Sequence, residues 1–202
     1  MKRLTGWSCA WLIAVVLSGC GPAPRVRPLT PESVVLAFGD SLTAGTGADG
    51  NESYPAVLAG LLGCKVVNAG IPGETSPEGL DRLPDVLKQH KPDLVLLCHG
   101  GNDMLQKVND EVITRNVRAM IEAAQGCGAD VILLGVPKPG LFLRAPPFYA
   151  EVAATCKIPY EAKVLPEILS TRSLKSDAIH PNAEGYRKLA GRVAALIRKR
   201  GA

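Results

Sequence analysis

Three residues of this chain have the types and spacing needed for acyl transfer: Ser41, Asp177 and His180. A serine hydroxyl is a weak nucleophile until a base removes its proton, and a histidine can act as that base near neutral pH. A carboxylate must then fix the imidazole tautomer and stabilise its cation. Asp177 and His180 lie three residues apart, so one turn can join them, and Pro181 biases His180 away from helical angles. We therefore predict a nucleophile, a base and an orienting carboxylate.

The elements that must position these residues alternate between strand-like and helix-like segments. Short apolar runs are typical of strands buried on both faces, and longer periodic segments are typical of helices. Such alternation predicts an α/β fold, with a parallel sheet and helices on both of its faces. The expected strands are 34–38, 65–68, 94–98, 131–134 and a weak one at 158–162, and the expected helices are 54–62, 76–90 with a kink or restart at Pro84, 110–125, 149–156 and 182–200.

Unusual loops follow the first three predicted strands. They are Gly39-Asp40-Ser41-Leu42, Ala69-Gly70 and His99-Gly100-Gly101-Asn102-Asp103. Sites in parallel sheets gather at the carboxyl ends of strands, so these loops should meet. Each residue alone has a structural explanation: Ser41 could cap a helix, Asp177 and Asn102 could form turns, Gly70 could permit a turn, and His180 could lie on a surface loop. Their joint occurrence favours catalysis.

These blocks resemble the GDSL esterases, also called SGNH hydrolases, whose four signature residues are matched by Ser41, Gly70, Asn102 and His180. The branch of thioesterase I, lysophospholipase L1 and arylesterase is also similar over 66–76, and the likeness covers about 34–198. The resemblance implies a three-layer α/β/α sandwich with a central, mainly parallel, five-stranded sheet (flavodoxin-like). It implies Ser41 as nucleophile and His180 as base, oriented by Asp177. The N–H groups of Ser41 and Gly70 and the amide of Asn102 would form the oxyanion hole.

The implied reaction is hydrolysis of carboxylic esters or thioesters through an acyl-enzyme, without a cofactor or metal. Met104 and Leu105 follow Asn102 and are placed to touch an acyl chain, and Phe142 belongs to an apolar stretch that either lines the acyl groove or packs a helix. Two alternatives stay open. One is an esterase that removes O-acetyl groups from carbohydrate, and the other is a non-catalytic envelope module that binds lipid or glycan.

Four further polar residues lie beside these motifs. We interpret Asp40 and Asp103 as braces for their loops, and Glu74 as either a binding or a bracing residue. His99 departs from the family pattern, which more often has an apolar residue before the paired glycines. Its role stays open.

The first 19 residues predict a lipoprotein signal peptide. Lys2 and Arg3 precede an apolar run of about 11 residues, shorter than the roughly 20 that a membrane-spanning helix needs. Leu17-Ser18-Gly19-Cys20 resembles a lipobox, in which the cysteine is lipidated; an ordinary secretory signal with a chance cysteine is the alternative. Residues 20–31, which are rich in proline, would form a linker, and 32–202 would form the catalytic domain. The protein would be anchored to the bacterial cell envelope, on the periplasmic side.

Charge and cysteines add two further constraints. The formal net charge of +4 includes Lys2 and Arg3, which leaves +2 without the signal, too little to indicate a nucleic-acid partner. We expect a monomer that binds a small ester substrate. Sequence cannot choose among the pairings of Cys64, Cys98, Cys127 and Cys156, although Cys98 fits a buried strand.

Overall fold

A computed structural model describes residues 23–140 and 142–201. A five-stranded sheet in the order β2-β1-β3-β4-β5 forms its centre, and all four strand pairings are parallel. The predicted α/β/α fold and its five strands are confirmed, and the sheet is wholly rather than mainly parallel. The strands are β1 (Val34–Gly39), β2 (Lys65–Gly70), β3 (Leu94–Cys98), β4 (Asp130–Leu134) and β5 (Tyr160–Glu161).

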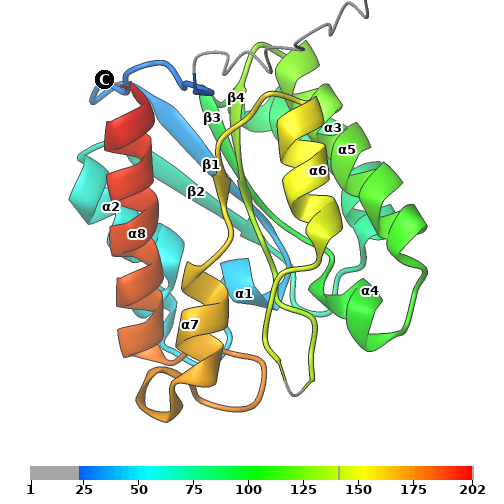
Figure 1. The fold of residues 1–202 in the computed structure, drawn as a ribbon. Helices are drawn as coiled ribbons and strands as arrows, with labels where there is room; N and C mark the ends of the chain where they lie inside the picture. The colour runs from blue at the N-terminus through cyan, green and yellow to red at the C-terminus, as the bar shows by residue number, and fades with distance from the viewer. Residues whose placement is uncertain (1–22, 141, 202) are drawn as a thin grey trace, which may run out of the picture.

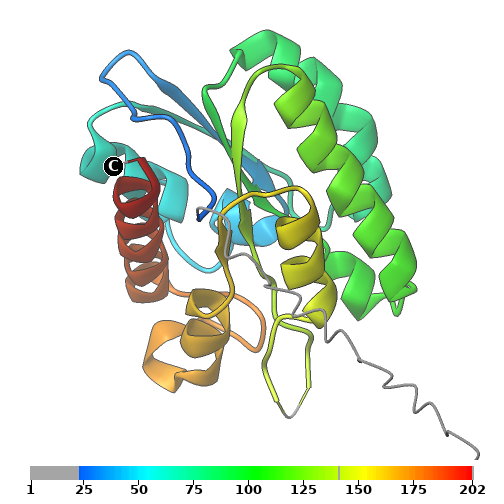
Figure 2. The ribbon, with the colours of Figure 1, turned by 45° about the horizontal axis from the view of Figure 1, so that its top comes forward.

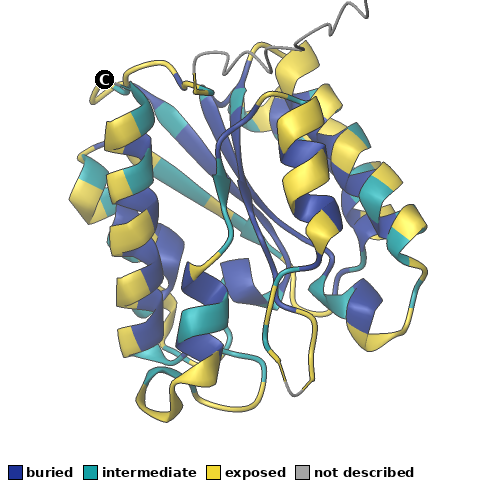
Figure 3. Cartoon of the chain, viewed as in Figure 1, coloured by how far each residue is buried: buried dark blue, intermediate teal, exposed yellow. Residues whose placement is uncertain are grey.

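Helices cover both faces of the sheet, as Figure 1 and the turned view in Figure 2 show. One layer holds α2, α7 and α8, and the other holds α3, α5 and α6, with the buried side of each helix turned to the sheet (Figure 3). The helices are α1 (Ser41–Ala44), α2 (Tyr54–Leu62), α3 (Ser76–His90), α4 (Gly101–Leu105), α5 (Asp110–Gly126), α6 (Pro147–Thr155), α7 (Val164–Ser170) and α8 (Ala183–Gly201), with 3-10 turns at Gly50–Glu52 and Arg172–Leu174.

The central strand β3 is buried along its whole length, as its run of apolar residues predicts. Its register with β1 pairs Gly39 with Cys98, and β1 also pairs Gly39 with Gly70 of β2. Three strands therefore end level with one another. The loops that begin at residues 40, 71 and 99 consequently share one edge of the sheet, where the sequence placed the site.

Helix α3 differs from its prediction at two points. Its N-cap is Thr75, whose N–H donates to Glu78 Oε2 at 2.8 Å, one residue before the predicted cap at Ser76. Ser76 instead donates to Asp103, from its N–H at 2.8 Å and from its hydroxyl at 2.6 Å. This contact confirms that Asp103 braces its loop. The helix also continues through Pro84 without the predicted restart.

The folded domain begins earlier than residue 32. Val26 is buried, and its N–H donates to the Arg200 carbonyl at 3.1 Å. Arg27 binds Asp130 Oδ2 through its backbone N–H at 2.6 Å and its Nε at 3.1 Å. The predicted linker therefore ends near residue 25. These contacts lie at the end of the sheet opposite to α1 and α4 (Figure 1).

The predicted signal peptide and Cys20 lie outside the described residues. Within 23–140 and 142–201, no helix has the length and apolar character required to cross a bilayer.

Candidate active site

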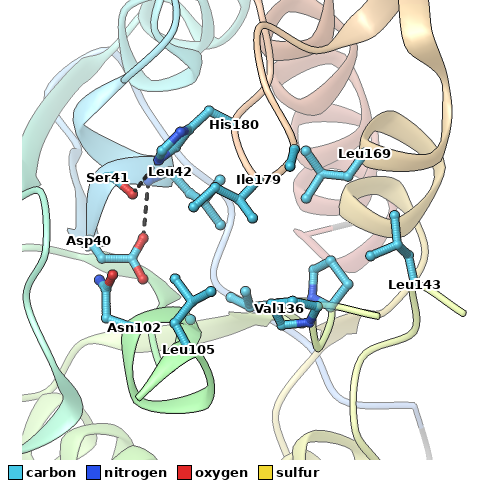
Figure 4. A pocket seen from close by; sticks show the side chains of 14 residues that line it. Asp40, Ser41, Leu42, Asn102, Leu105, Val136, Leu143, Leu169, Ile179 and His180 are labelled. Carbon is cyan, nitrogen blue, oxygen red and sulfur yellow. Dashed lines mark hydrogen bonds between the residues drawn. The ribbon is translucent and has the colours of Figure 1, made fainter. Parts of the chain in front are cut away.

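Ser41, His180 and Asp177 form one hydrogen-bonded chain. The Ser41 hydroxyl lies 3.0 Å from His180 Nε2, and His180 Nδ1 lies 2.8 Å from Asp177 Oδ2 (Figure 4 shows the first contact). The structure thus joins a nucleophile and a base that are 139 positions apart in the sequence. Because Asp177 accepts from Nδ1–H, the imidazole presents an unprotonated Nε2 to the serine hydroxyl, as a general base must.

Each of these three side chains is held by its local backbone. Ser41 begins α1, directly after β1, and Asp40 caps that helix by accepting the Leu42 N–H at 3.0 Å. This contact supports the interpretation of Asp40 as a brace. The segment that carries Asp177 and His180 is closed by an antiparallel bridge between Lys175 and Pro181. As predicted, His180 therefore lies in the loop before α8 and not within that helix.

The Asp177 carboxylate serves two purposes at once. Its Oδ1 accepts hydrogen bonds from the backbone N–H groups of Ile179 and His180, each at 2.8 Å, while Oδ2 accepts one from Nδ1–H of the His180 imidazole. Burial raises the pKa of Asp177, but hydrogen bonds from the His180 ring and these two N–H groups outweigh it, so the pKa lies below its usual value. The same carboxylate thus shapes its own turn and contacts the imidazole in the geometry that an orienting role requires.

The second predicted oxyanion donor, Gly70, does not fit that role. Its N–H donates to Asn68 Oδ1 at 3.0 Å, so it is already engaged. A Cβ at Gly70 would lie 2.1 Å from the Ala44 nitrogen, which shows that glycine is needed there for β2 to pack closely against α1. Gly70 is thus explained by packing, whereas Ser41 has an N–H without a hydrogen-bond partner in 23–140 and 142–201.

Gly73 is the better candidate for the backbone donor. It has a φ of 83°, in a turn closed by the Glu74 N–H and the Ile71 carbonyl at 3.2 Å. Its own N–H has no hydrogen-bond partner within the described residues. The neighbouring Glu74 carbonyl accepts Asn102 Nδ2 at 2.9 Å, which places this turn beside the predicted amide donor. The Pro72-Gly73 dipeptide, typical of a type II turn, was the sequence signal that could have identified it.

An apolar pocket opens beside Ser41 and His180 (Figure 4). Of the three residues predicted to touch substrate, Leu105 lines it. Met104 is buried in the core, and Phe142 is 75% exposed and lies outside the lining, so neither prediction is supported. The sequence analysis predicted neither α7, which supplies Leu169 to the pocket, nor the contribution of Ile179. The apolar lining consists mainly of Leu42, Leu105, Val136, Leu143, Leu169 and Ile179.

The described part of the chain contains no group of three or more histidine, cysteine, aspartate or glutamate side chains that could hold a metal. Cys64, Cys98, Cys127 and Cys156 are all free thiols, and burial raises the pKa of Cys98 well above its usual value.

The GDSL-like lipase/acylhydrolase family model matches residues 37–188, which include Ser41, Asp177 and His180. The chain belongs to this family. A relative in Escherichia coli K12, thioesterase 1/protease 1/lysophospholipase L1, is 32% identical over 74% of this chain and 76% of its own length. The esterase TesA of Pseudomonas aeruginosa is 37% identical over 62% of this chain. That alignment spans 65% of the relative, slightly less than two thirds.

A solved structure of TesA has the same fold as this member of the family. It superposes with a TM-score of 0.75 and 30% identity, over 83% of this chain and 99% of that one. Because the match covers nearly the whole of that chain, it supports the α/β/α architecture described above.

Proposed function

We propose that the protein hydrolyses carboxylic esters or thioesters through an acyl-enzyme on Ser41. The observation that carries the proposal is the hydrogen-bonded chain from Ser41 through His180 to Asp177, which ends beside an apolar pocket. His180 removes the hydroxyl proton as Ser41 attacks the carbonyl carbon, and then gives that proton to the leaving alcohol or thiol. A water activated by the same imidazole releases the acid.

The developing oxyanion would be stabilised by the N–H groups of Ser41 and Gly73 and by the second amide hydrogen of Asn102. The first hydrogen of that amide is held by the Glu74 carbonyl. Removing one such donor costs about 10²–10³ in kcat in other hydrolases. Gly73 replaces Gly70 in this set because the Gly70 N–H is occupied.

The pocket supports acyl groups of short to medium length. Leu105, Ile179 and Leu169 give it an apolar wall beside the nucleophile (Figure 4). An acyl chain in contact with them would gain about 0.8 kcal/mol for each methylene removed from water. The preference for thioester, aryl ester or lysophospholipid would then depend on how the leaving group fits outside this wall.

A chain-length panel of aryl esters and acyl-CoAs, measured on residues 21–202, tests this proposal. We expect turnover that rises with acyl length up to the capacity of the pocket and that Ser41→Ala abolishes, with unchanged circular dichroism. Full activity of folded Ser41→Ala would overturn the proposal. A preference for acetylated glycan over every aryl ester would favour the carbohydrate O-acetyl esterase instead.

We also propose that Cys20 carries a lipid, which anchors the protein to the bacterial envelope on its periplasmic side. The lipobox-like residues 17–20 support this, and Cys20 lies only six positions before Val26, which is fixed to the domain. At most about 3.5 Å per residue, the tether is about 20 Å long or shorter. It joins the domain at the end of the sheet opposite to α1 (Figure 1), the helix that begins with Ser41, which favours substrates that approach from the side away from the anchor.

Cys20→Ser tests the anchor. We expect the substitution to block lipid attachment and to move the protein from the membrane to the soluble fraction. Unchanged mass and fractionation would refute lipidation. We further propose that the protein acts as a monomer, since one chain supplies every residue of the site, and sedimentation of residues 21–202 would check this.

A further inference from the structure

A buried cluster of three charged or polar side chains lies behind the oxyanion loops. Glu74 accepts two hydrogen bonds from Arg82, from Nε at 2.7 Å and from Nη2 at 2.8 Å. His99 Nε2 lies 3.1 Å from the same carboxylate. The exposed fraction of the side chain is 0% for His99, 5% for Glu74 and 24% for Arg82. An ion pair whose carboxylate is this well buried is costly to form, so the geometry calls for a reason beyond stability.

The backbone fixes the tautomer of His99. The Gly100 N–H donates to Nδ1 at 3.1 Å, so Nδ1 carries no hydrogen and Nε2 must be the donor to Glu74. Space for the ring is provided by Gly79 on α3, where a Cβ would lie 2.4 Å from Nε2. Burial raises the pKa of Glu74, but its bonds with His99 and Arg82 outweigh it and leave the pKa below its usual value.

Residue 74 connects the two loops that hold the proposed donors. Its side chain is fixed by His99, and its carbonyl accepts the Asn102 amide at 2.9 Å, so the loop 99–102 grips residue 74 at two points. Arg82 Nη2 also donates to the Ala69 carbonyl at 3.1 Å, so Arg82 contacts the chain just before the 71–74 turn as well as Glu74 at its end. Because a side-chain amide is planar, fixing one hydrogen of Asn102 fixes the direction of the other.

We propose that Glu74, Arg82 and His99 are positioning residues for the oxyanion hole. They hold the 71–74 turn against the 99–102 loop, so that the second amide hydrogen of Asn102 points at the developing oxyanion. The inference rests on the proposed function. It gives a specific role to His99, which departs from the family pattern, because its Nε2–H bridges the two loops.

Two substitutions at His99 separate this bridge from a general packing role. In His99→Gln, the side-chain amide can replace Nε2 as the donor to Glu74. In His99→Asn, the shorter side chain can replace Nδ1 as the acceptor for Gly100 but cannot reach Glu74. The control is His90→Asn, the same change on the half-buried end of α3.

With the aryl ester that the wild type hydrolyses best, we expect His99→Asn to lower kcat by about 10- to 100-fold with KM within about twofold. His99→Gln should keep kcat within about threefold of the wild type, and His90→Asn should equal it. Wild-type kcat in His99→Asn, equal losses in both His99 variants, or a change in KM alone would each overturn the proposal.

Thermal unfolding of each variant identifies loss of fold. If His99→Asn does not fold, Arg82→Lys serves instead, since it keeps the charge but loses the two-point grip on Glu74. A fall in kcat with unchanged KM is then expected, and wild-type kcat would contradict the proposal. Ser41→Ala is assayed in the same series, so a failure of the proposed function shows as turnover that does not depend on Ser41.

Discussion

At the scale of single residues, the exposure of the catalytic groups matters as much as their distances. The side chain of His180 is 14% exposed, whereas that of Asp177 is 54% exposed. A carboxylate this open to water orients the imidazole chiefly through hydrogen-bond geometry, because solvent screens its charge. The two backbone N–H groups on Oδ1 keep Oδ2 aimed at the ring.

Asp177→Asn should therefore act through the tautomer of His180. The asparagine amide can donate to Nδ1, which favours the imidazole with its hydrogen on Nε2, facing Ser41, where it cannot accept a proton. We expect kcat to fall on the order of 10³–10⁴-fold, while KM and the unfolding midpoint change little. Steady-state kinetics with an aryl ester measures this, and a loss of less than tenfold would contradict the orienting role.

The lowered pKa of Asp177 determines the pH range in which this carboxylate affects the stability of the fold. Because its folded pKa is lowered, its contribution to stability is complete above the unfolded pKa of about 3.9 and is lost as pH falls through the folded value. Above about pH 4 the carboxylate thus stays ionised.

Sequence reasoning predicted which three side chains meet at the proposed site, because few other patterns require a nucleophile, a base and a carboxylate together. It failed for Gly70 because glycine has two uses that look identical in a sequence, close packing and donation from an exposed N–H. It also failed for Met104, since a residue two positions after Asn102 faces the core once α4 forms. The contact between Glu74 and His99 could not be predicted, because two buried residues 25 positions apart in the sequence leave no local pattern.

At the scale of elements, the strands and the long helices followed their predicted patterns, whereas the short helices did not. β3 and α5 have strong apolar signals and appear with nearly the predicted bounds. α4 and α7, with five and seven residues, are too short for a helical period to show in the sequence. Leu105 of α4 and Leu169 of α7 line the pocket. The apolar lining of the pocket was therefore the part of the site that the sequence predicted least well.

Two glycines within helices should respond to alanine in opposite ways. Gly191 on α8 is exposed, and a Cβ there meets nothing within 4 Å, so Gly191→Ala should stabilise by about 0.5–1 kcal/mol. Gly79 on α3 has the same helical preference, but its Cβ would collide with the buried His99 ring. We expect Gly79→Ala to destabilise, and urea unfolding of the two variants measures both. Equal stabilisation would contradict the packing around His99.

At the scale of the whole molecule, the segment 26–31 belongs to the domain and closes the end of the sheet away from the site. The Arg27 side chain bridges the Asp130 carboxylate and the carbonyls of Asp93 and Gly128, so it joins the loops before β3 and before β4. The prolines in 22–31 suggested a free spacer. The prediction failed because it weighed composition alone and not the single buried side chain, Val26.

Removing this segment should weaken the fold without changing the site. We expect residues 32–202 to be less stable than residues 21–202 by about 1–3 kcal/mol, the range for exposing one buried valine together with its associated bonds. Turnover per folded molecule should be the same. Urea unfolding and active-site titration measure the two quantities, and equal stability of both chains would show that 26–31 does not belong to the domain.

The nucleophilic role of Ser41 has its most direct test in covalent labelling. The Ser41 oxygen should displace fluoride from the phosphorus of a fluorophosphonate. The folded protein then carries one phosphonyl group, which peptide mass spectrometry should locate on Ser41. Ser41→Ala and the heat-denatured wild type should gain no mass. A folded wild type that stays unlabelled, or that is labelled at another serine, would contradict this role of Ser41.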